Sequence, residues 1–361
     1  MKKIFLCIPT LSNAGAQRFV TELACGLNKD VYTPIVVVTN KLDAEAPFYC
    51  KLVESRIQVE DVSDTSYIKE TKKIINLIKK EKPDLVHSNV GAVLHMFLPM
   101  ILSRTKVNHL FTVHSMGWRI FSGIKKSIIK LGFKTKKIVP VAICETVKKS
   151  IVDAYGIKTE FVEMVYNGVD TRWFTPYGDA CKQRIFSFVT TGRLEKVKNH
   201  RLLIEAFHKF HLKYSNTCLK LVGDGELRNS LEQLVAELNI KDAIVFEGNQ
   251  SDVGKYLNNA DVYCCSSFVE GLPIAVLEAM ACGLPIITTS AGGVVDIVEN
   301  NKNGYVVDSD VSKICECMER LYLNTDLRNR MGEASRERAE ELDLSVCAKN
   351  YEYLYEKYIA C

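Results

Sequence analysis

The sequence lacks the cysteine spacings that mark a metal site or a disulfide framework. Its 361 residues include 13 cysteines, an odd number, and no two of them form a C-x-x-C pair. Most lie in apolar stretches, as Cys264 and Cys265 do, which is typical of reduced core cysteines in a cytosolic protein. The sequence therefore predicts no zinc site, no disulfides and a cytoplasmic location.

Two common phosphate-binding motifs are also missing. Neither G-x-x-x-x-G-K-[ST] nor G-x-G-x-x-G occurs, and no acidic residue closes the predicted strand that ends at Thr39. These absences disfavour a P-loop protein and a dinucleotide-binding protein. The loop T-L-S-N-A-G-A-Q-R at 10–18 does contain Gly15, whose backbone could approach a ligand. An ordinary strand-to-helix turn is the alternative for this loop.

No hydrophobic run is long enough for a membrane span or a signal peptide. The apolar stretch that follows the first three residues stops at Pro9. The longest run, residues 91–102, contains His95 and Pro99 and is shorter than a transmembrane helix. We therefore expect neither secretion nor a transmembrane helix.

Acidic residues are absent from one long segment of this chain of net charge +4. None occurs between Asp84 and Glu145, whereas residues 120–137 interleave lysines with apolar residues at helical spacing. Such a basic amphipathic helix commonly lies on an anionic membrane surface. A solvated helix face is one alternative; nucleic acid is another, disfavoured because no binding motif or aromatic interleaving occurs. The predicted membrane-contacting residues are Lys125, Lys126, Lys130 and Lys134.

Strand-like and helix-like stretches alternate along the whole chain, which predicts parallel sheets covered by helices on both faces. The polar stretches at 166–170 and 175–183 suit a linker between two such domains. The predicted strands are Lys3–Ile8, Ile35–Thr39, Leu85–Ser88, Val107–Val113, Ile138–Ala142, Phe161–Val165, Ile185–Thr190, Cys218–Leu221, Ile244–Phe246, Val262–Cys265, Ile286–Thr288 and Tyr305–Val307. The predicted helices are Ala16–Leu27, Tyr67–Lys80, Glu145–Tyr155, Asn199–Lys213, Leu227–Leu238, Val253–Asn258, Val311–Tyr322 and a last one at about 344–358.

The stretch F-V-E-G-L-P-I-A-V-L-E-A-M-A-C-G-L-P at 268–285 follows a predicted buried strand. Its glycine turn opens a short helix at Ile274–Cys282, and a helix N-terminus binds anions. Glu270 in that turn suits sugar hydroxyls, so a nucleotide-sugar fits the combination of anion site and carboxylates. The equally supported alternative is that Glu270 satisfies the helix dipole and that Glu278 is an exposed helical residue.

Two basic residues follow the first strand of the second half. Arg193 and Lys198 lie in T-G-R-L-E-K-V-K-N at 191–199 and would reach over the carboxyl end of that strand. An arginine fork together with a lysine charge suits a pyrophosphate leaving group. Surface charge in a loop is the alternative.

Four further features have more than one interpretation. G-D-G-E at 223–226 and A-G-G-V at 291–294 would let the backbone approach a ligand, but helix caps or plain glycine turns fit equally well. D-S-D at 308–310 resembles a metal-binding D-x-D, but we interpret it as an N-cap because a helix is predicted from Val311. His114 follows a predicted strand and could position hydroxyls or carry a proton; a satisfied core or surface histidine is the alternative.

Taken together these motifs resemble glycosyltransferase family 4, whose members have the GT-B fold. Glu270 and Glu278, with seven residues between them, match the family's E-x7-E signature, and G-L-P after the first Glu is typical. The other matching motifs follow the family's usual order over essentially the whole chain: Asn167-Gly168-Val169-Asp170, Arg193, Lys198, Gly223-Asp224-Gly225 and Gly292-Gly293-Val294.

The chain departs from the family pattern at two places. Ser115 follows His114 where an acid is often found, and Asn13-Ala14 precede Gly15 where further glycines are frequent. Both departures concern acceptor contacts more than donor binding.

The resemblance implies a retaining, metal-independent transferase that uses a nucleoside-diphosphate sugar, by default a UDP-sugar, and no cofactor. It implies catalytic roles for His114 and Glu270 at the donor sugar. The residues implied in donor binding are Gly15, Arg193, Lys198, Gly223, Gly271, Leu272, Pro273, Ile274 and Glu278, and those implied in acceptor binding are Asn13 and Gln17.

The resemblance also implies an α/β architecture of two Rossmann-like, doubly wound domains facing a cleft. We expect an N-terminal domain of residues 1–166 plus 344–361, because the last helix of such proteins packs back, and a donor-binding domain of residues 167–343. The expected acceptor is a lipid-linked or glycan intermediate of surface polysaccharide (capsule, O-antigen or exopolysaccharide), met on the inner face of the cell membrane. A sugar-nucleotide epimerase of the same general fold and a catalytically silent nucleotide-sugar-binding module are the alternatives.

Overall fold

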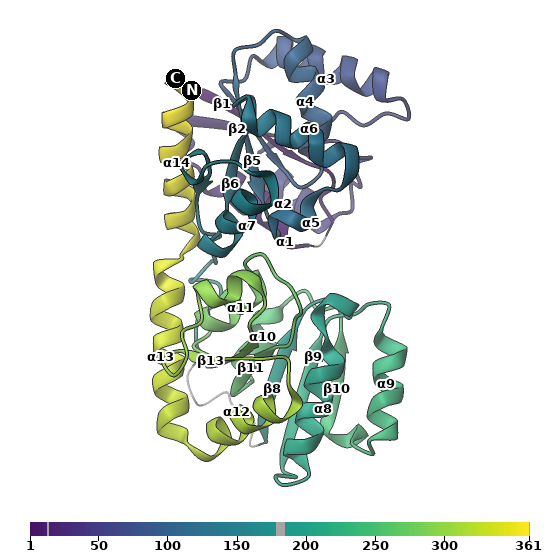
Figure 1. The fold of residues 1–361 in the computed structure, drawn as a ribbon, viewed down its shortest axis with the longest axis vertical. Coiled ribbons are helices and arrows are strands. Elements are labelled where there is room, and N and C mark those ends of the chain that lie inside the picture. The colour runs from purple at the N-terminus through teal and green to yellow at the C-terminus, as the bar shows by residue number, and fades with distance from the viewer. Residues whose placement is uncertain (13, 178–184, 361) are drawn as a thin grey trace. The chain divides into compact units, whose positions relative to one another are not determined.

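The computed structural model describes residues 1–12, 14–177 and 185–360, and the chain forms two compact units (Figure 1). Unit 1 comprises Met1–Gly168 with Leu344–Cys361, and unit 2 comprises Val169–Asp343. Each unit has one parallel β-sheet with helices packed against it, the Rossmann-like arrangement that alternating strands and helices predict.

The described part of unit 1 contains seven strands: β1 (Lys2–Ile8), β2 (Tyr32–Val38), β3 (Gln58–Asp61), β4 (Leu85–Asn89), β5 (Asn108–Val113), β6 (Val139–Ala142) and β7 (Glu163–Met164). They pair in parallel in the order β3-β2-β1-β4-β5-β6-β7. The helices are α1 (Gly15–Gly26), α2 (Pro47–Glu54), α3 (Tyr67–Glu81), α4 (Ala92–Leu102), α5 (Gly117–Ile120), α6 (Gly123–Lys134), α7 (Glu145–Tyr155) and α14 (Leu344–Ile359).

The interior strand β1 supplies side chains to two cores, one on each face of the sheet. Ile4, Leu6 and Ile8 pack into the core beneath α1 and α14, whereas Phe5 and Cys7 pack into the core beneath α3 and α4. Successive residues of a strand point to opposite faces, so a continuous apolar run marks a strand buried on both sides. The run from Ile4 to Ile8 therefore indicates the middle of a covered sheet.

Several elements of unit 1 differ from the sequence-based expectation. Strand β3 is a short edge strand without a buried residue, so its sequence carries no apolar signal. Helix α4 is apolar nearly all round and contains Pro99, so it shows no helical stripe. The strand expected at Phe161–Val165 is only the two residues of β7, because Thr159–Phe161 forms a 3₁₀ turn.

Unit 2, without the undescribed residues 178–184, contains six strands: β8 (Phe186–Thr191), β9 (Thr217–Val222), β10 (Ile244–Gly248), β11 (Val262–Cys265), β12 (Ile286–Thr289) and β13 (Gly304–Val307). They pair in parallel in the order β10-β9-β8-β11-β12-β13. The helices are α8 (His200–His211), α9 (Arg228–Glu237), α10 (Val253–Asn258), α11 (Ile274–Ala281), α12 (Val311–Leu323) and α13 (Thr325–Glu341). The chain reverses its direction across the sheet between β8 and β11, where open α/β sheets bind ligands at the carboxyl ends of the strands.

Helix α13 was not predicted, although it is the longest helix of unit 2 among the described residues. It packs against α11 through small residues, because a Cβ atom on Gly332 would lie only 2.3 Å from the carbonyl oxygen of Gly283. A contact made by small residues leaves no large apolar stripe in the sequence.

Candidate functional site

The strongest candidate site lies in unit 2 at the carboxyl ends of β8 and β11, the topological switch point of its sheet. A short 3₁₀ turn, η3 (Lys196–Lys198), follows β8, and the loop from Ser266 to Pro273 follows β11. The two segments are joined by hydrogen bonds from the Phe268 amide to the Val197 carbonyl (2.8 Å) and from Ser266 Oγ to the Lys198 carbonyl (2.9 Å). The loop that carries Glu270 is therefore fastened to the turn that carries Lys198.

Lys198 and Glu270 form an ion pair at this edge of the sheet. Lys198 Nζ lies 2.8 Å from Glu270 Oε1, and the same oxygen accepts a hydrogen bond from Ser267 Oγ at 2.6 Å. Thr289 Oγ1 in turn donates to the Ser267 carbonyl at 2.6 Å. The structure thus brings together two predicted site residues that are 72 positions apart in the chain.

The Lys198 ammonium is charged at neutral pH. Burial alone would lower its pKa, but the negative charge of Glu270 and the nearby Cys265 outweigh burial and raise it. A cation held beside a carboxylate in a largely buried place is a preorganised partner for a phosphate anion.

Arg193, the other predicted cation, is much more exposed. It lies in the loop after β8, its side chain is 68% exposed, and its Nη2 is 3.3 Å from Glu195 Oε1. The surrounding protein thus holds Arg193 less tightly than Lys198. Both nevertheless belong to the same loop at the carboxyl end of one strand.

The glycine turns beside this pair are shaped by close packing of backbone on backbone. Gly192 and Gly223 have φ angles of +144° and +140°, and a Cβ atom on Gly223 would lie 2.0 Å from the Gly192 carbonyl oxygen. The Gly223 amide donates to the Gly248 carbonyl at 2.8 Å. The close approach that Gly223 permits is therefore to the neighbouring turn of the same sheet.

The alternative interpretation of this stretch, that Glu270 satisfies the helix dipole, requires Glu270 to lie at the start of the helix. The helix begins four residues after it. Helix α11 starts at Ile274 with Pro273 as its N-cap, and its first turn contains no acidic residue, so Glu270 lies outside it. Glu278 is 4% exposed, so the alternative of an exposed helical glutamate is wrong. Gly271 and Leu272 are buried between Glu270 and the helix.

A small cavity of about 10 Å³ lies beside the ion pair, which is about the smallest space that can hold one water molecule. Lys198, Glu270, Tyr263 and His200 are among the residues that line it. Sequence reasoning missed Ser267 and His200, which carry only weak signals: Ser267 follows a buried strand, and His200 directly follows the Lys198 motif.

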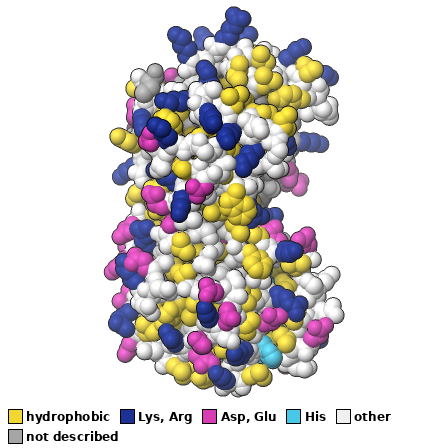
Figure 2. Space-filling model, viewed as in Figure 1, with side chains coloured by type: hydrophobic (Ala, Val, Ile, Leu, Met, Phe, Trp, Pro, Cys, Tyr) yellow, Lys and Arg dark blue, Asp and Glu magenta, His cyan; other side chains and the backbone are white. Residues whose placement is uncertain are grey.

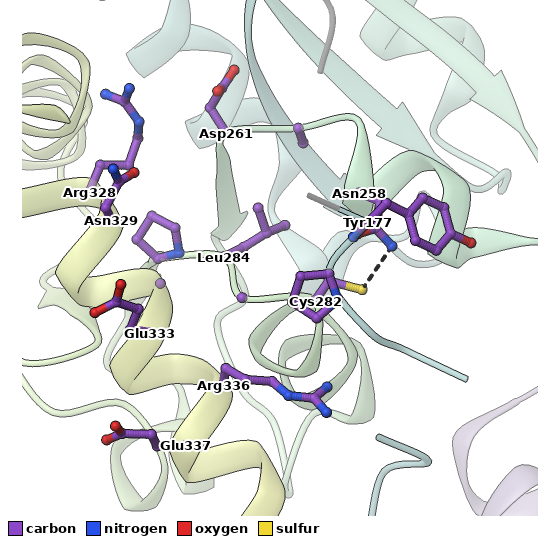
Figure 3. Close-up of a pocket in the computed structure, with 15 residues that line it drawn as sticks. Tyr177, Asn258, Asp261, Cys282, Leu284, Arg328, Asn329, Glu333, Arg336 and Glu337 are labelled. Atoms are coloured by element: carbon purple, nitrogen blue, oxygen red, sulfur yellow. Dashed lines mark hydrogen bonds between the residues drawn. The ribbon is translucent and has the colours of Figure 1, made fainter. Parts of the chain in front are cut away.

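A much larger cavity, of about 510 Å³, lies at the opposite edge of the same sheet (Figure 3). Asp261 and Pro285, which directly precede β11 and β12, are in its wall, and helix α13 contributes Arg336. The Arg336 guanidinium donates to the carbonyls of Thr171, Phe174 and Ala281, so it holds backbone together. The predicted donor-binding residues are not among the described residues that line this cavity.

Local contacts show the roles of the remaining acidic motifs of unit 2. Asp310 caps α12 by accepting a hydrogen bond from the Lys313 amide at 2.9 Å, which confirms the N-cap interpretation. The N-cap of α9 is Leu227, and Asp224 instead accepts from the Gly225 amide at 2.7 Å and pairs with Arg228. Among the described residues, no group of three or more His, Cys, Asp or Glu side chains is placed to hold a metal ion.

In unit 1, His114 follows β5 at the carboxyl edge of the sheet. Its Nε2 lies 2.8 Å from Asn89 Oδ1, and its ring packs edge-on against Phe19 with centroids 4.9 Å apart. Burial lowers the pKa of His114, so the imidazole is neutral at pH 7. His114 has a hydrogen-bond partner, as a satisfied histidine does, but it stands at the edge where ligands bind.

The loop after β1 lies at the same edge. Gly15 is the first residue of α1, and Gln17 Nε2 donates to Thr10 Oγ1 at 3.2 Å. Asn13, predicted together with Gln17 to contact the acceptor, lies outside the described residues.

A second candidate surface is formed by α6 in unit 1. Ile124, Ile128 and Leu131 share one face of this helix and are 78%, 37% and 58% exposed. Figure 2 shows hydrophobic side chains gathered in this part of unit 1 among lysine and arginine side chains. Among the described residues, no helix combines the length and the apolar character needed to cross a bilayer.

The four predicted lysines of α6 differ in their surroundings. Lys125 and Lys134 are exposed, and helical spacing places them on either side of the apolar face. Lys126 and Lys130 are half-buried, and the Lys126 ammonium lies 5.7 Å from the ring centre of Tyr155 on the neighbouring helix α7. Only Lys125 and Lys134 of the four are therefore fully available to an outside surface.

Both halves of the chain match models of known protein families. Residues 13–173 match the model of glycosyltransferase family 4, and residues 179–338 match the model of the glycosyl transferases of group 1. A glycosyltransferase of Haemophilus influenzae is 26% identical over 94% of this chain and 96% of its own. The UDP-Gal:alpha-D-GlcNAc-diphosphoundecaprenol alpha-1,3-galactosyltransferase of Escherichia coli is 29% identical over 71% of each chain.

The fold also has solved counterparts. The crystal structure of Anabaena HepE in complex with UDP and glucose superposes with a TM-score of 0.87 at 17% identity, covering 99% of this chain and all of the other. At that identity the likeness concerns the fold alone.

Proposed function

The chain belongs to the glycosyltransferase families that its two halves match and has the GT-B fold; from this premise we propose that it is a retaining, metal-independent transferase of a sugar from a nucleoside-diphosphate donor. The observation that carries the proposal is the Lys198–Glu270 pair at the switch point of the unit 2 sheet. It places a fixed positive charge next to a carboxylate, which matches a substrate that joins a diphosphate to a polyhydroxyl ring.

Lys198 and Arg193 are proposed to neutralise the diphosphate as it departs. The bond between the anomeric carbon and the phosphate oxygen breaks with its electrons moving to phosphate, so negative charge grows there. A preorganised cation is worth most where charge develops. Lys198 supplies such a cation because Glu270, itself held by Ser267, keeps it in place, and the exposed Arg193 can close on the diphosphate when the donor binds.

Glu270 is proposed to accept hydrogen bonds from the donor sugar, and Glu278, by family analogy, from the ribose. Each carboxylate has two oxygens with several acceptor positions, so Glu270 can keep its bonds to Lys198 and Ser267 and still accept from a hydroxyl. Gly271, Leu272 and Ile274 each carry an amide that could face the phosphates, whereas Pro273 has none and serves the turn. Gly15 is proposed to approach phosphate from unit 1.

His114 is proposed to steady the donor sugar as a neutral hydrogen-bonding group. Its Nε2 lies close to Asn89, and its depressed pKa argues against a role as a charged acid at pH 7. In the proposed reaction the acceptor oxygen bonds to the anomeric carbon on the face that the phosphate leaves. The acceptor proton passes to a departing phosphate oxygen, which accounts for every atom without a protein base.

The proposed donor is a UDP-sugar and the proposed acceptor is a lipid-linked or glycan intermediate of surface polysaccharide. UDP is named in complexes of HepE and in the name of the E. coli relative, which acts on an undecaprenol-linked sugar. A Staphylococcus aureus relative, CapM, is named for capsular polysaccharide biosynthesis and is 25% identical over 83% of each chain.

The proposed location is cytoplasmic, on the inner face of the cell membrane, through α6. Insertion of Ile124, Ile128 and Leu131 would remove exposed apolar surface from water, while Lys125 and Lys134 would contact anionic headgroups.

A thermal-shift screen of nucleotides tests the donor assignment. A ligand that binds only the folded protein at 100 times its Kd stabilises it by about 2.7 kcal/mol. We expect UDP or a UDP-sugar to raise the melting temperature more than ADP, GDP or CDP do, without added metal and in the presence of a chelator. No shift with any nucleotide would contradict the proposal.

Sedimentation with liposomes tests the membrane assignment. We expect Lys125→Glu with Lys134→Glu, and separately Ile124→Ser with Leu131→Ser, to reduce binding to anionic vesicles. Lys241→Glu with Lys255→Glu on the surface of unit 2 makes the same charge change and is the matched control. Equal sedimentation of all variants would discard the membrane role.

A further inference from the structure

His200 is a buried polar residue next to the donor site that the proposed mechanism does not use. It is the first residue of α8, two positions after Lys198, and only 2% of it is exposed. Its Nδ1 atom is buried without a hydrogen-bond partner among the described residues. A buried polar atom without a partner is costly and uncommon in folded proteins, so this nitrogen needs an explanation.

The imidazole lies in the wall of the 10 Å³ cavity that Lys198 and Glu270 also line. The other titratable groups in that wall are Tyr263 and Cys265. The Tyr263 hydroxyl lies 3.2 Å from Thr191 Oγ1, and Cys265 Sγ lies 3.6 Å from Ser267 Oγ. These two groups thus have protein partners, whereas His200 Nδ1 has none among the described residues.

We propose that His200 is a positioning residue of the donor site, whose Nδ1 accepts a hydrogen bond from one water molecule in this cavity that also contacts the Lys198–Glu270 pair. This inference rests on the proposed function, because it assigns the water the task of holding Lys198 where a diphosphate would meet it. The cavity has room for one such molecule, and its wall offers several hydrogen-bonding groups, which a buried water requires.

The charge state of His200 fits this role. Burial and the positive charge of Lys198 lower its pKa to about 4, so the ring is neutral at pH 7. A neutral ring with Nε2 protonated has a free acceptor at Nδ1. A protonated ring would place a second positive charge beside Lys198 and offer no acceptor, which would weaken the pair.

Two substitutions separate a hydrogen-bonding role from a space-filling one. His200→Asn keeps an oxygen acceptor close to the position of Nδ1, whereas His200→Phe keeps the ring volume and removes the acceptor. His208→Asn, on the same helix and away from the cavity lining, is the matched control. The melting temperature of each variant establishes that it is folded.

UDP binding measured by calorimetry at pH 7.5 is the first readout. We expect His200→Phe to weaken UDP binding by about tenfold, the scale of one lost hydrogen bond to a charged group, and His200→Asn to stay within about threefold of wild type. We also expect wild-type affinity to fall below about pH 5 and the affinity of His200→Asn to fall less. Equal affinity of His200→Phe and wild type would overturn the inference.

High-resolution crystal structures of the ligand-free wild type and His200→Phe are the second readout, and they do not depend on which nucleotide binds. We expect an ordered water within about 3 Å of Nδ1 in the wild type, and a lost water with a displaced Lys198 in the variant. A dry wild-type cavity, or an unmoved Lys198 in the variant, would overturn the inference even if UDP binds. Failure of the wild type to bind UDP, with the water present, would instead contradict the proposed donor.

Discussion

The two units share a Rossmann-like sheet but differ in what stands at its carboxyl edge. In unit 2 the edge carries a charged pair, Lys198 with Glu270, fastened by Ser267. In unit 1 the group that follows β5 at the corresponding edge is the neutral imidazole of His114, which contacts the Asn89 side-chain amide. The same scaffold therefore offers fixed charge in one unit and neutral hydrogen bonds in the other.

The contrast shows that the chemistry resides in the turns after the strands and not in the sheet itself. A departing diphosphate needs the fixed charge, whereas sugar hydroxyls need neutral donors and acceptors that do not compete for the phosphate. Unit 1 carries its positive charge instead on its outer surface, around the apolar face of α6. If this division is right, substitutions in the two units should fail in different ways.

The largest effect is expected when the cation at the carboxyl edge of the unit 2 sheet is removed. Lys198→Ala should lower kcat/KM by about two orders of magnitude, about 3 kcal/mol of transition-state stabilisation, because it removes the cation held at the switch point. Lys196→Ala removes an exposed lysine from the same 3₁₀ turn and is the matched control. Steady-state kinetics with donor and acceptor measure the difference, and near wild-type turnover of Lys198→Ala would remove the charge argument.

The next expected effect concerns the glycine turns at Gly192 and Gly223, beside the Lys198–Glu270 pair. Gly223→Ala should destabilise the protein by about 3 kcal/mol, because its Cβ would lie 2.0 Å from the Gly192 carbonyl at a φ of +140°. Gly156→Ala in unit 1 also has a positive φ, +60°, but the nearest atom to its Cβ is the Lys130 ammonium at 3.9 Å, so about 1 kcal/mol is expected. Urea unfolding of both variants checks this difference, and equal costs would show that overlap with Gly192 is not what constrains the turn.

Much of this architecture could be predicted because its signals are local. Continuous apolar runs of four to six residues marked strands such as β1 and β11, since strands covered on both faces are apolar throughout. Parallel strands bring their carboxyl ends to one edge of the sheet, which placed His114, Lys198 and Glu270 at strand ends.

The parts that could not be predicted depend on contacts between distant residues. Lys198 and Glu270, which are 72 residues apart in the chain, meet because β8 and β11 are neighbours in the sheet. Helix α13 packs through Gly332 and other small residues, and β3 is a polar edge strand, so neither has an apolar pattern. Burial of Glu278 was also hidden, because a glutamate on a short helix is usually exposed.

The buried, neutral His87 of unit 1 should make the stability of the protein depend on pH. Buried His87 has one ring nitrogen 2.7 Å from the Tyr355 hydroxyl of α14 and the other 2.7 Å from Thr112 Oγ1. Burial, with smaller contributions from His114 and His109, lowers its pKa to about 3. Because the unfolded value is about 6.5, the unfolded state binds more protons between these two values.

The contribution of His87 to stability is therefore complete above about pH 6.5 and is lost as the pH falls towards 3. Over this range the free energy of unfolding falls by at most about 1.4 kcal/mol per pH unit. His87→Gln should melt lower at pH 7 but lose less stability on acidification, as measured by melting temperatures from pH 7 to pH 4. His208→Gln in unit 2 should leave the slope unchanged. Parallel curves for wild type and His87→Gln would show that His87 does not titrate in this way.

The smallest expected effect comes from how the helices of the two units begin. Asp252, Asp310 and Asn324 cap helices of unit 2 with their side chains, whereas Ser66 at the start of α3 in unit 1 makes no side-chain cap bond.

Asp310→Ala should therefore cost about 1 kcal/mol, because the Lys313 amide loses its acceptor and α12 loses a negative charge at its positive end. Ser66→Ala should change the free energy of unfolding by less than about 0.5 kcal/mol. Chemical denaturation of the two variants measures the difference directly. A Ser66→Ala cost as large as that of Asp310→Ala would mean that the α3 cap forms in solution, and that the units do not differ in this respect.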